Sequence, residues 1–261
     1  MTPDYDSIRA VNFSSLKFMA TSPMAYRWHV DHPEPRKAAF VLGGAIHCAI
    51  LEPERFASRY AVFDGTRRGK AWDEWQAERP GVESLKPDEL ARVEACALAV
   101  SRHRVASGLL RGGRTEESMT WQDPVTGLML KGRMDYIRPD AVIDLKSTRD
   151  PSPWHFSRDA AKYHLHAQLA MYHDGATVIG KIDGKTLPFI VAVDSSEPHD
   201  VACFQLSQAT VDAGRALYRS WLRRLIQSVE ADFWPGVAPD LETLELPPWM
   251  DGQSISTEDE F

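Results

Sequence analysis

The stretch of sequence that decides the fold is LMLKGRMDYIRPDAVIDLKS, which runs from residue 128 to residue 147. Polar and apolar residues alternate on both sides of the turn sequence RPDA, as in two half-buried strands that form a hairpin. In such a hairpin Asp135 lies directly opposite Asp144, with Cβ atoms roughly 4.5–5.5 Å apart, and Lys146 shares the face of Asp144. The opposite face carries apolar residues that suit packing under helices, namely Leu130, Met134, Tyr136, Ile143 and Leu145.

Two carboxylates this close repel each other, and one would be protonated unless a positive group joined them. Mg²⁺ suits such a pair because it takes oxygen ligands from one or two carboxylates and completes its shell with water and substrate phosphate. A bound cation polarises a phosphoryl oxygen and lowers the pKa of water. Lys146 beside it can orient the attacking water or balance charge on the phosphate. The spacing alone also fits a surface hairpin with an ordinary Asp–Lys ion pair, and we interpret Asp140 as a turn residue.

The segments around this hairpin predict a mixed α/β (α+β) protein with a central mixed sheet flanked by helices and an N-terminal helical elaboration. Asn12 is placed to cap a helix that Pro23 interrupts, and residues 64–71 are expected to form a basic loop. Hydrophobic periodicity predicts helices over 40–51 (entered through Gly43-Gly44), 87–110, 153–176 and 208–229, and further strands over 115–121, 186–194 and 200–206. We expect one domain over residues 1–232, mainly helical over 1–110 and sheet-based over 111–232, followed by an acidic, poorly ordered tail over 233–261.

Charge does not exclude DNA as a partner, although the formal net charge is -7. Nine of the 37 acidic residues and none of the 30 Lys and Arg residues lie in residues 230–261, so the rest of the chain is close to neutral. A polyanion-binding groove needs only a local positive field. Basic clusters occur at Arg36-Lys37, Arg67-Arg68-Gly69-Lys70, Lys131-Gly132-Arg133 and Arg223-Arg224, each of which can also be a solvated surface.

Other features of composition narrow the class of protein. No stretch approaches 18 consecutive apolar residues, which argues against a membrane span, and the first ten residues do not resemble a secretory signal. The three cysteines, Cys48, Cys96 and Cys203, are far apart and odd in number, which argues against a disulfide framework or a cysteine-based metal site. We therefore expect a reducing, cytoplasmic location.

Four motifs in order resemble the PD-(D/E)xK nuclease superfamily, and more narrowly the branch with RecB-type nuclease domains and phage RecE-like exonucleases (exonuclease VIII). The motifs are Gly43-Gly44-Ala45-Ile46-His47, Gly132-Arg133-Met134-Asp135, Val142-Ile143-Asp144-Leu145-Lys146-Ser147 and Gln168-Leu169-Ala170-Met171-Tyr172. The Ser14-Ser15-Leu16 helix, Ser22-Pro23 and Arg68-Gly69-Lys70-Ala71-Trp72 resemble the phage RecE-like members in particular. The likeness covers residues 12 to about 230.

The resemblance implies a metal site and a catalytic lysine. Asp135, Asp144 and the backbone carbonyl of Leu145 would bind one or two Mg²⁺ or Mn²⁺ ions, His47 would add an imidazole ligand, and Lys146 would be catalytic. A lone histidine in an apolar helix is more often a core residue, so the ligand role of His47 depends on the resemblance. The family often has Glu where this chain has Asp144, whose side chain has a shorter reach.

Several further residues are candidates for the site or for contacts with DNA. Gln168 and Tyr172 lie four residues apart on one helix face, where they either line a catalytic cleft or form a polar helix surface. Either Glu116 or Glu117 could reach the active face, since the strand register is open there. Trp72 and Trp75 either stack on bases or belong to the core. Candidate contacts to DNA phosphates are Arg27, Arg36, Lys37, Arg67, Arg68, Lys70 and Arg133.

The resemblance also implies an activity. RecE-like members are exodeoxyribonucleases that degrade one strand of linear double-stranded DNA in the 5′-to-3′ direction without ATP. They leave 3′ single-stranded overhangs for a single-strand annealing protein in phage or prophage recombination, and they form homo-oligomeric rings around DNA ends in the bacterial host cell. The alternatives are an endonuclease or single-strand nuclease of the same fold, a catalytically silent DNA-end-binding recombination partner, and an unrelated hydrolase of small phosphoesters.

Overall fold

A mixed sheet forms the centre of this computed structural model, which describes residues 5–33 and 39–247 of the 261. Its described strands are β1 (Val11–Asn12), β4 (Arg114–Gln122), β5 (Met129–Arg138), β6 (Ala141–Thr148), β7 (Phe189–Asp194) and β8 (Val201–Gln205). The order is β1-β5-β6-β7-β8, and β4 also pairs with β5. β1 is parallel to β5 and β6 is parallel to β7, whereas the pairs β4–β5, β5–β6 and β7–β8 are antiparallel. The predicted fold class and the five longer strands are confirmed.

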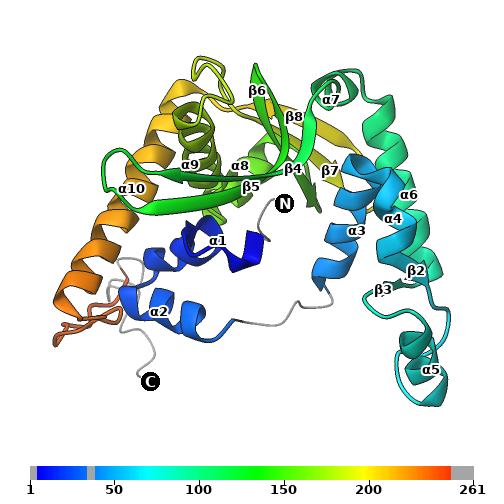
Figure 1. The fold of residues 1–261 in the computed structure, drawn as a ribbon, viewed down its shortest axis with the longest axis horizontal. Coiled ribbons are helices and arrows are strands. Elements are labelled where there is room, and N and C mark those ends of the chain that lie inside the picture. Colours follow the sequence, from blue (N-terminus) through cyan, green and yellow to red (C-terminus); the bar gives the residue numbers. More distant parts are fainter. Residues whose placement is uncertain (1–4, 34–38, 248–261) are drawn as a thin grey trace, which may run out of the picture.

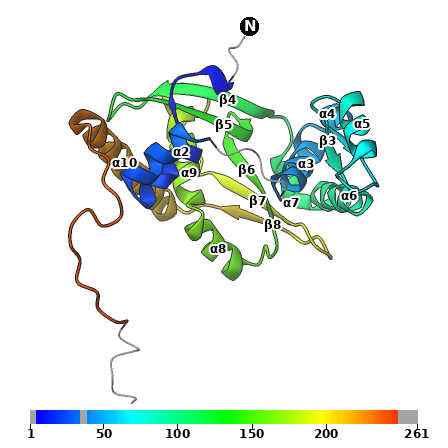
Figure 2. The same ribbon diagram turned by 90° about the horizontal axis from the view of Figure 1, so that it is seen from below.

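Helices cover both faces of this sheet (Figures 1 and 2). The described α-helices are α1 (Phe13–Leu16), α2 (Pro23–Asp31), α3 (Ala39–Leu51), α4 (Pro53–Arg59), α5 (Lys70–Glu78), α6 (Pro87–Arg102), α7 (Arg104–Leu109), α8 (Pro153–Lys162), α9 (Leu165–Val178) and α10 (Gln208–Ala231). Short 3₁₀ helices occur at Tyr5–Ser7 and Lys17–Ala20. Among the described helices, none combines the length and the apolar character needed to cross a bilayer.

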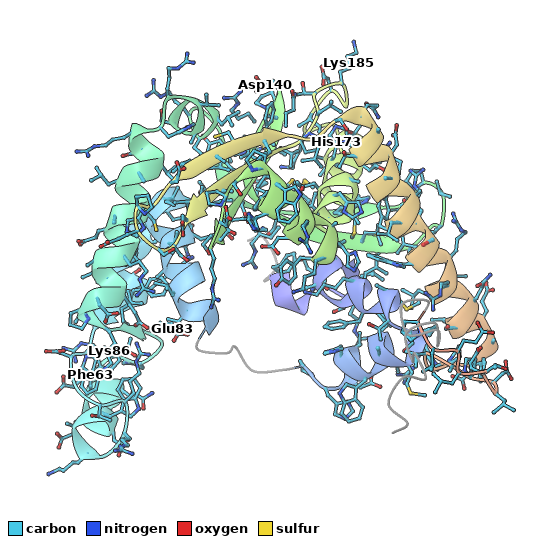
Figure 3. The ribbon with its side chains drawn as sticks, turned by 180° about the vertical axis from the view of Figure 1, so that it is seen from behind. Phe63, Glu83, Lys86, Asp140, His173 and Lys185 are labelled. Carbon is cyan, nitrogen blue, oxygen red and sulfur yellow. The ribbon has the colours of Figure 1, made fainter. Side chains whose placement is uncertain are left out.

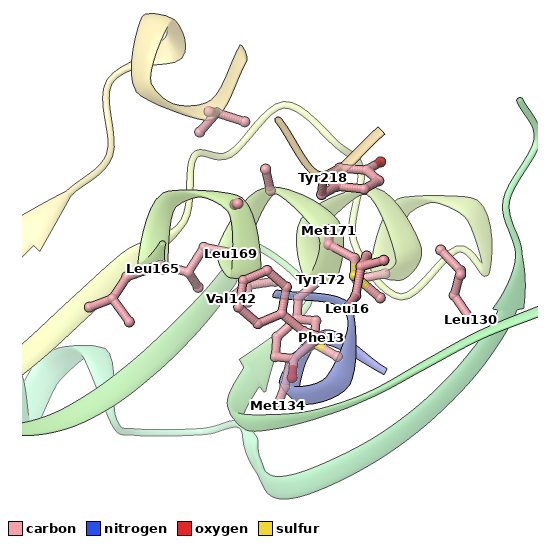
Figure 4. Close-up of a cluster of buried hydrophobic side chains, with 14 of the residues drawn as sticks. Phe13, Leu16, Leu130, Met134, Val142, Leu165, Leu169, Met171, Tyr172 and Tyr218 are labelled. Carbon is pink, nitrogen blue, oxygen red and sulfur yellow. The ribbon is translucent and has the colours of Figure 1, made fainter. Parts of the chain in front are cut away.

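The sheet therefore separates two hydrophobic cores. One core joins α1, α9 and α10 to the sheet, and Figure 4 shows Phe13, Leu16, Leu169 and Tyr218 packing around α9. The other core joins α3 and α6 to the opposite face of the sheet. These cores hold the strands and helices whose ends meet at the candidate site.

The prediction that the apolar residues of the hairpin share one face is wrong. Leu130 and Met134 belong to the first core, whereas Tyr136, Ile143 and Leu145 belong to the second. The alternation along β5 is interrupted at Asp135. Opposite Asp135 on β4, Glu116 has a left-handed φ of 48°, and the regular ladder has a gap between the pairs Thr115–Tyr136 and Glu117–Met134. This irregularity redirects the side chains that follow, and helices on both faces bury them.

Two of the predicted helices are each divided in two. The helix over 87–110 is interrupted at His103, which takes an extended conformation and caps α7 by accepting a hydrogen bond from the Ala106 backbone N–H at 3.2 Å. The helix over 153–176 is interrupted at Tyr163 and His164, and His164 has a left-handed φ of 57°. Gly43 and Gly44 lie inside α3 rather than at its entrance. The expected helix break at Pro23 is confirmed.

The predicted cap at Asn12 is also confirmed. Its side-chain Oδ1 accepts a hydrogen bond from the Ser15 backbone N–H at 2.8 Å, which begins α1. Ser22 caps α2 in the same way, through a 3.0 Å bond from the Ala25 backbone N–H. These two caps fix the first residues of α1 and α2.

A small lobe extends from α3 and α6. It consists of α5 and the parallel pair β2 (Tyr60–Val62) and β3 (Glu83–Leu85), and Figure 3 shows Phe63 near its end. Trp72 and Trp75 stack on each other with ring centroids 5.3 Å apart, and both rings contact Phe63. The two tryptophans are half-buried and pack on each other and on Phe63 within the lobe. Figure 2 shows the chain after α10 running away from the body, and residues 233–247 form no helix or strand.

Candidate active site

The hairpin strands separate at the two aspartates. The pairs Tyr136–Ile143, Ile137–Val142 and Arg138–Ala141 confirm the predicted register. The next position along would pair Asp135 with Asp144, but there the ladder ends, and the Asp135 Oδ2 accepts a hydrogen bond from the Leu145 backbone N–H at 2.8 Å. A carboxylate therefore takes the place of a strand partner, which opens the sheet where the acidic residues lie.

Three side chains from different elements meet at this opening. Ligand atoms of His47 on α3, Glu116 on β4 and Asp135 on β5 all lie within 4.8 Å of one another. The His47 Nδ1 is 3.8 Å from the Asp135 Oδ2. The left-handed φ of Glu116 is strained for a residue with a Cβ, and such strain is concentrated at functional sites.

Asp144 and Lys146 lie beside this cluster. The Lys146 Nζ is 2.6 Å from the Asp144 Oδ2 and 4.0 Å from the Asp135 Oδ2. Burial would lower the pKa of Lys146, but the charges of Asp144 and Asp135 outweigh it and raise that pKa. Burial also raises the pKa of Asp144 to about 6, although Lys146 opposes the shift. The site therefore holds a protonated amine against a deeply buried carboxyl group.

The electrostatics of the cluster fit a divalent cation. Burial, reinforced by Asp135 and Glu52, raises the pKa of Glu116 to about 7. Burial and the Lys146 ammonium lower the pKa of His47 to about 4, so its imidazole is neutral near pH 7, the form that binds metals. The cluster thus brings two carboxylates and a neutral imidazole together. These are the donor types that Mg²⁺ and Mn²⁺ use.

A cavity of about 950 Å³ opens from this cluster. His47, Glu116 and Lys146 line it, together with arginines from α4 and β5. Glu52, which is 5% exposed, binds Arg55 at 2.5 Å and Arg59 at 2.7 Å on one side of the cavity. The predicted DNA contact Arg133 lines the same cavity. Four cationic side chains therefore line the space that leads to the acidic cluster, together with Glu52, Glu83 and Glu116.

A second cavity, of about 320 Å³, lies on the other side of Lys146. Gln168 and Tyr172 both line it, so the helix face that they share is turned toward Lys146. The Gln168 Nε2 lies 3.5 Å from the Tyr172 hydroxyl. Gly132 lies against the Tyr172 ring, and a Cβ at residue 132 would come 2.6 Å from its Cε1.

The remaining predicted DNA contacts lie away from the cluster or outside the described residues. Arg27 pairs with Asp31 at 2.7 Å, and Arg67 pairs with Glu89 at 2.7 Å. Lys70 lies 3.6 Å from Glu74. Arg68, Lys70 and the loop before α5 belong to the small lobe, where both side chains are exposed. Arg36 and Lys37 lie outside the described residues.

Some site residues could not be chosen from the sequence. Of the two candidate glutamates on β4, Glu116 joins the cluster, whereas Glu117 forms ion pairs with Lys181 and Arg114. Lys17, which lines the second cavity, follows the Ser14-Ser15-Leu16 motif directly, and that position is the signal that could have found it. No sequence motif indicates the ion pairs of Glu52 with Arg55 and Arg59.

Comparisons with known proteins agree with this geometry. Residues 12–247 match the model of a family described as a PDDEXK-like domain of unknown function (DUF3799). A solved structure from Eubacterium rectale, described as a "Putative exonuclease", superposes with a TM-score of 0.65 at 13% identity, covering 98% of each chain. A structure described as SSO0001 covers 71% of this chain and 87% of its own at 18% identity, but its TM-score of 0.28 supports no argument. No curated protein matches the chain.

The family model spans the strands and helices that supply every residue of the candidate site, from α3 to α9. The superposition covers nearly the whole chain and shows a shared fold. The family model is described as PDDEXK-like, which confirms the predicted PD-(D/E)xK nuclease superfamily. The chain belongs to the DUF3799 family of PDDEXK-like domains.

Proposed function

We propose that this protein is a metal-dependent nuclease that hydrolyses phosphodiester bonds in DNA. The observation that carries the proposal is the convergence of His47, Glu116 and Asp135 within 4.8 Å, next to a lysine held by Asp144 at 2.6 Å. A structural ion pair would need neither the third carboxylate nor the imidazole. Membership of a PDDEXK-like family supports the same chemistry.

The chain's own residues divide the work of hydrolysis. His47, Glu116 and Asp135 would hold the cation, with Asp144 and the Leu145 carbonyl on the same side of the opening as further candidate ligands. When bound, the cation supplies Lewis-acid polarisation of a phosphoryl oxygen and a lower pKa for water. Lys146, kept protonated by Asp144, donates hydrogen bonds that orient water and offset the negative charge that develops on the phosphate. Water loses a proton to solvent as its oxygen bonds to phosphorus, the bond to the leaving sugar oxygen breaks, and that oxygen takes up a proton from solvent.

The finer proposal is an exodeoxyribonuclease that acts 5′-to-3′ on linear double-stranded DNA without ATP. The order of motifs that resembles phage RecE-like enzymes supports it, as does the cavity of about 950 Å³ lined by arginines beside the cluster. On the same resemblance we propose DNA ends as substrate, Mg²⁺ or Mn²⁺ as cofactor, a homo-oligomeric ring, and a single-strand annealing protein as partner in recombination. Residues 1–232 would act as one domain.

An end-labelled DNA duplex tests the activity. With Mg²⁺ and no ATP, we expect a linear duplex to be degraded, a 5′ label to be released early, and a 3′ label to remain on long products. EDTA should stop the reaction, and closed circular DNA should stay intact. Cleavage of the circle would show an endonuclease, cleavage of single strands alone would show a single-strand nuclease, and binding to ends without cleavage would contradict catalysis.

A further inference from the structure

The cavity of about 320 Å³ beside Lys146 differs in character from the one that holds the acidic cluster. Its wall contains the rings of Phe13, Phe156, Tyr163 and Tyr172. Phe13, Phe156 and Tyr172 are buried, whereas Tyr163 is 56% exposed and forms the rim. The volume is at the small end of the range for small-molecule sites, about 300–1,000 Å³. The space therefore suits one flat group rather than a helix or a strand.

Polar side chains also line this cavity, including Lys146, the proposed catalytic lysine. Lys146 and Ser147 line both cavities, so the two spaces meet at the proposed reaction centre. Lys17 adds a second ammonium to the aromatic cavity. An anionic phosphate at the lysines and a flat ring between aromatic side chains together describe a nucleotide.

The backbone turns at the rim of the cavity. Tyr163 follows the last residue of α8, and His164 comes next with a left-handed φ of 57°. The His164 carbonyl accepts the first hydrogen bonds of α9, from Ala167 at 3.0 Å and Gln168 at 3.1 Å. This turn places the Tyr163 ring and the Gln168 amide on the same cavity, where the amide can donate or accept hydrogen bonds at the edge of a ring and the Asp159 carboxylate can accept them.

We propose that this aromatic cavity binds the base of the nucleotide next to the scissile phosphate, unstacked from its neighbours, with Tyr163 stacked on it. The proposal rests on the nuclease function proposed above and deepens it. Enzymes that extract a base read it by stacking between aromatic side chains and by hydrogen bonds to its edge. Unstacking costs least where the strand is already frayed or single, which is the condition at a DNA end.

Ligand binding tests this pocket without relying on cleavage. Calorimetric titration of the full-length protein with dAMP and with 2-deoxyribose 5-phosphate separates the contribution of the base from that of the phosphate. We expect dAMP to bind roughly tenfold more tightly, since stacking on an aromatic side chain has an effect of this size. Tyr163→Ala should remove that difference, and Tyr163→Phe should keep it. Trp154→Ala is the matched control, because Trp154 is a 63% exposed aromatic residue of α8 outside the cavity.

Cleavage supplies the second test. Linear duplexes that carry an abasic tetrahydrofuran residue at the terminal or the next position should be cut roughly tenfold more slowly than intact duplexes at the affected bond. Tyr163→Ala should cut both substrates at the same reduced rate. Equal binding of dAMP and 2-deoxyribose 5-phosphate would contradict the proposed base-binding cavity. Equal cleavage of intact and abasic ends by an active enzyme would contradict it too, and neither result would contradict the proposed nuclease function. Base-dependent binding of dAMP without any cleavage would support the pocket and reject the nuclease.

Discussion

The Lys146 Nζ lies 2.6 Å from the Asp144 Oδ2, at the point where β5 and β6 separate. Asp144 is 3% exposed, so its carboxyl group is largely removed from water, whereas the Lys146 side chain keeps 27% of its exposure. An ammonium in this position has its charge fixed and directed toward the opening that contains Asp135. The buried Asp144 therefore holds the Lys146 ammonium at the proposed active site.

Replacing the lysine should remove activity without unfolding the protein. We expect Lys146→Ala to lower the rate of DNA cleavage by about 10²–10⁴-fold, because the substitution removes a donor and a charge that act on the phosphate. Asp135→Ala should have an effect at least as large. Circular dichroism and thermal unfolding should show that both variants fold. Near-wild-type cleavage by Lys146→Ala would reject the role proposed for this residue.

The two adjacent glutamates of β4 provide a matched pair for metal binding. Glu116→Gln should weaken binding of Mn²⁺ at least about tenfold, because it removes a charged oxygen donor from the cluster. Glu117→Gln should leave Mn²⁺ affinity unchanged, since Glu117 pairs with Lys181 instead. Calorimetric or electron paramagnetic resonance titration of the metal-free protein measures both. Equal affinities in the two variants would remove Glu116 from the site.

Asp174 should stabilise the packing of α9 against α10 in a pH-dependent way. Its carboxylate accepts hydrogen bonds from Arg215 at 2.7 and 2.8 Å and from the Tyr218 hydroxyl at 2.7 Å. Burial alone would raise the pKa of Asp174, but the neighbouring His173, Arg215 and Tyr218 outweigh it and lower the pKa well below its ordinary value. We expect Asp174→Asn to reduce the free energy of unfolding by about 2–4 kcal/mol at pH 7.

The sign of the pH dependence follows from this lowered pKa. The stabilisation is complete above the pKa of the unfolded aspartate, about 3.9, and is lost as pH falls from there toward the folded pKa. Urea unfolding should therefore show a constant difference between wild type and Asp174→Asn from pH 8 to 5 and a smaller one below about pH 4. Asp212→Asn is the control. Its 55% exposed side chain also binds Arg215, but it should contribute no more than about 1 kcal/mol. A difference for Asp174→Asn that did not shrink in acid would contradict the assignment.

Gly132 should be needed for the position of Tyr172. A Cβ there would lie 2.6 Å from the buried Tyr172 ring, so Gly132→Ala should destabilise the protein by about 1–3 kcal/mol through overpacking. Gly108→Ala in α7 meets no atom within 4 Å and should raise the free energy of unfolding by about 0.5–1 kcal/mol. Denaturant unfolding compares the two, and an equally neutral Gly132→Ala would show that the ring has room to move.

The hairpin could be predicted because all of its information is local. The register follows from the strand alternation and from pairing the two strands symmetrically about the RPDA turn. The pair Tyr136–Ile143 confirms it. The bend at Asp135 could not be predicted, because it depends on a left-handed backbone at Glu116 on another strand. For the same reason the sequence did not distinguish Glu116 from Glu117, since a slip of one residue turns every side chain to the other face.

The second cavity shows the other limit of sequence reasoning. Phe13 comes from α1, whereas Phe156, Tyr163 and Tyr172 lie at least 143 residues later in α8, in the turn after it and in α9, and only the packing of these helices against the sheet brings them together. Gln168 and Tyr172 were predictable as a shared helix face. Tyr163 was not, because the periodicity of 153–176 favours one continuous helix, whereas the chain turns at His164, whose ring packs edge-to-face with the distant Trp221.

The most direct test of the central claim is the position of a bound metal ion. A crystal soaked in Mn²⁺ and measured at the manganese absorption edge should show an anomalous peak between His47, Glu116 and Asp135, within coordination distance of at least one oxygen from each carboxylate. The peak should be lost in Glu116→Gln crystals or strongly reduced. A wild-type cluster that stays empty in Mn²⁺, or an ion bound elsewhere with these three side chains unengaged, would contradict the account.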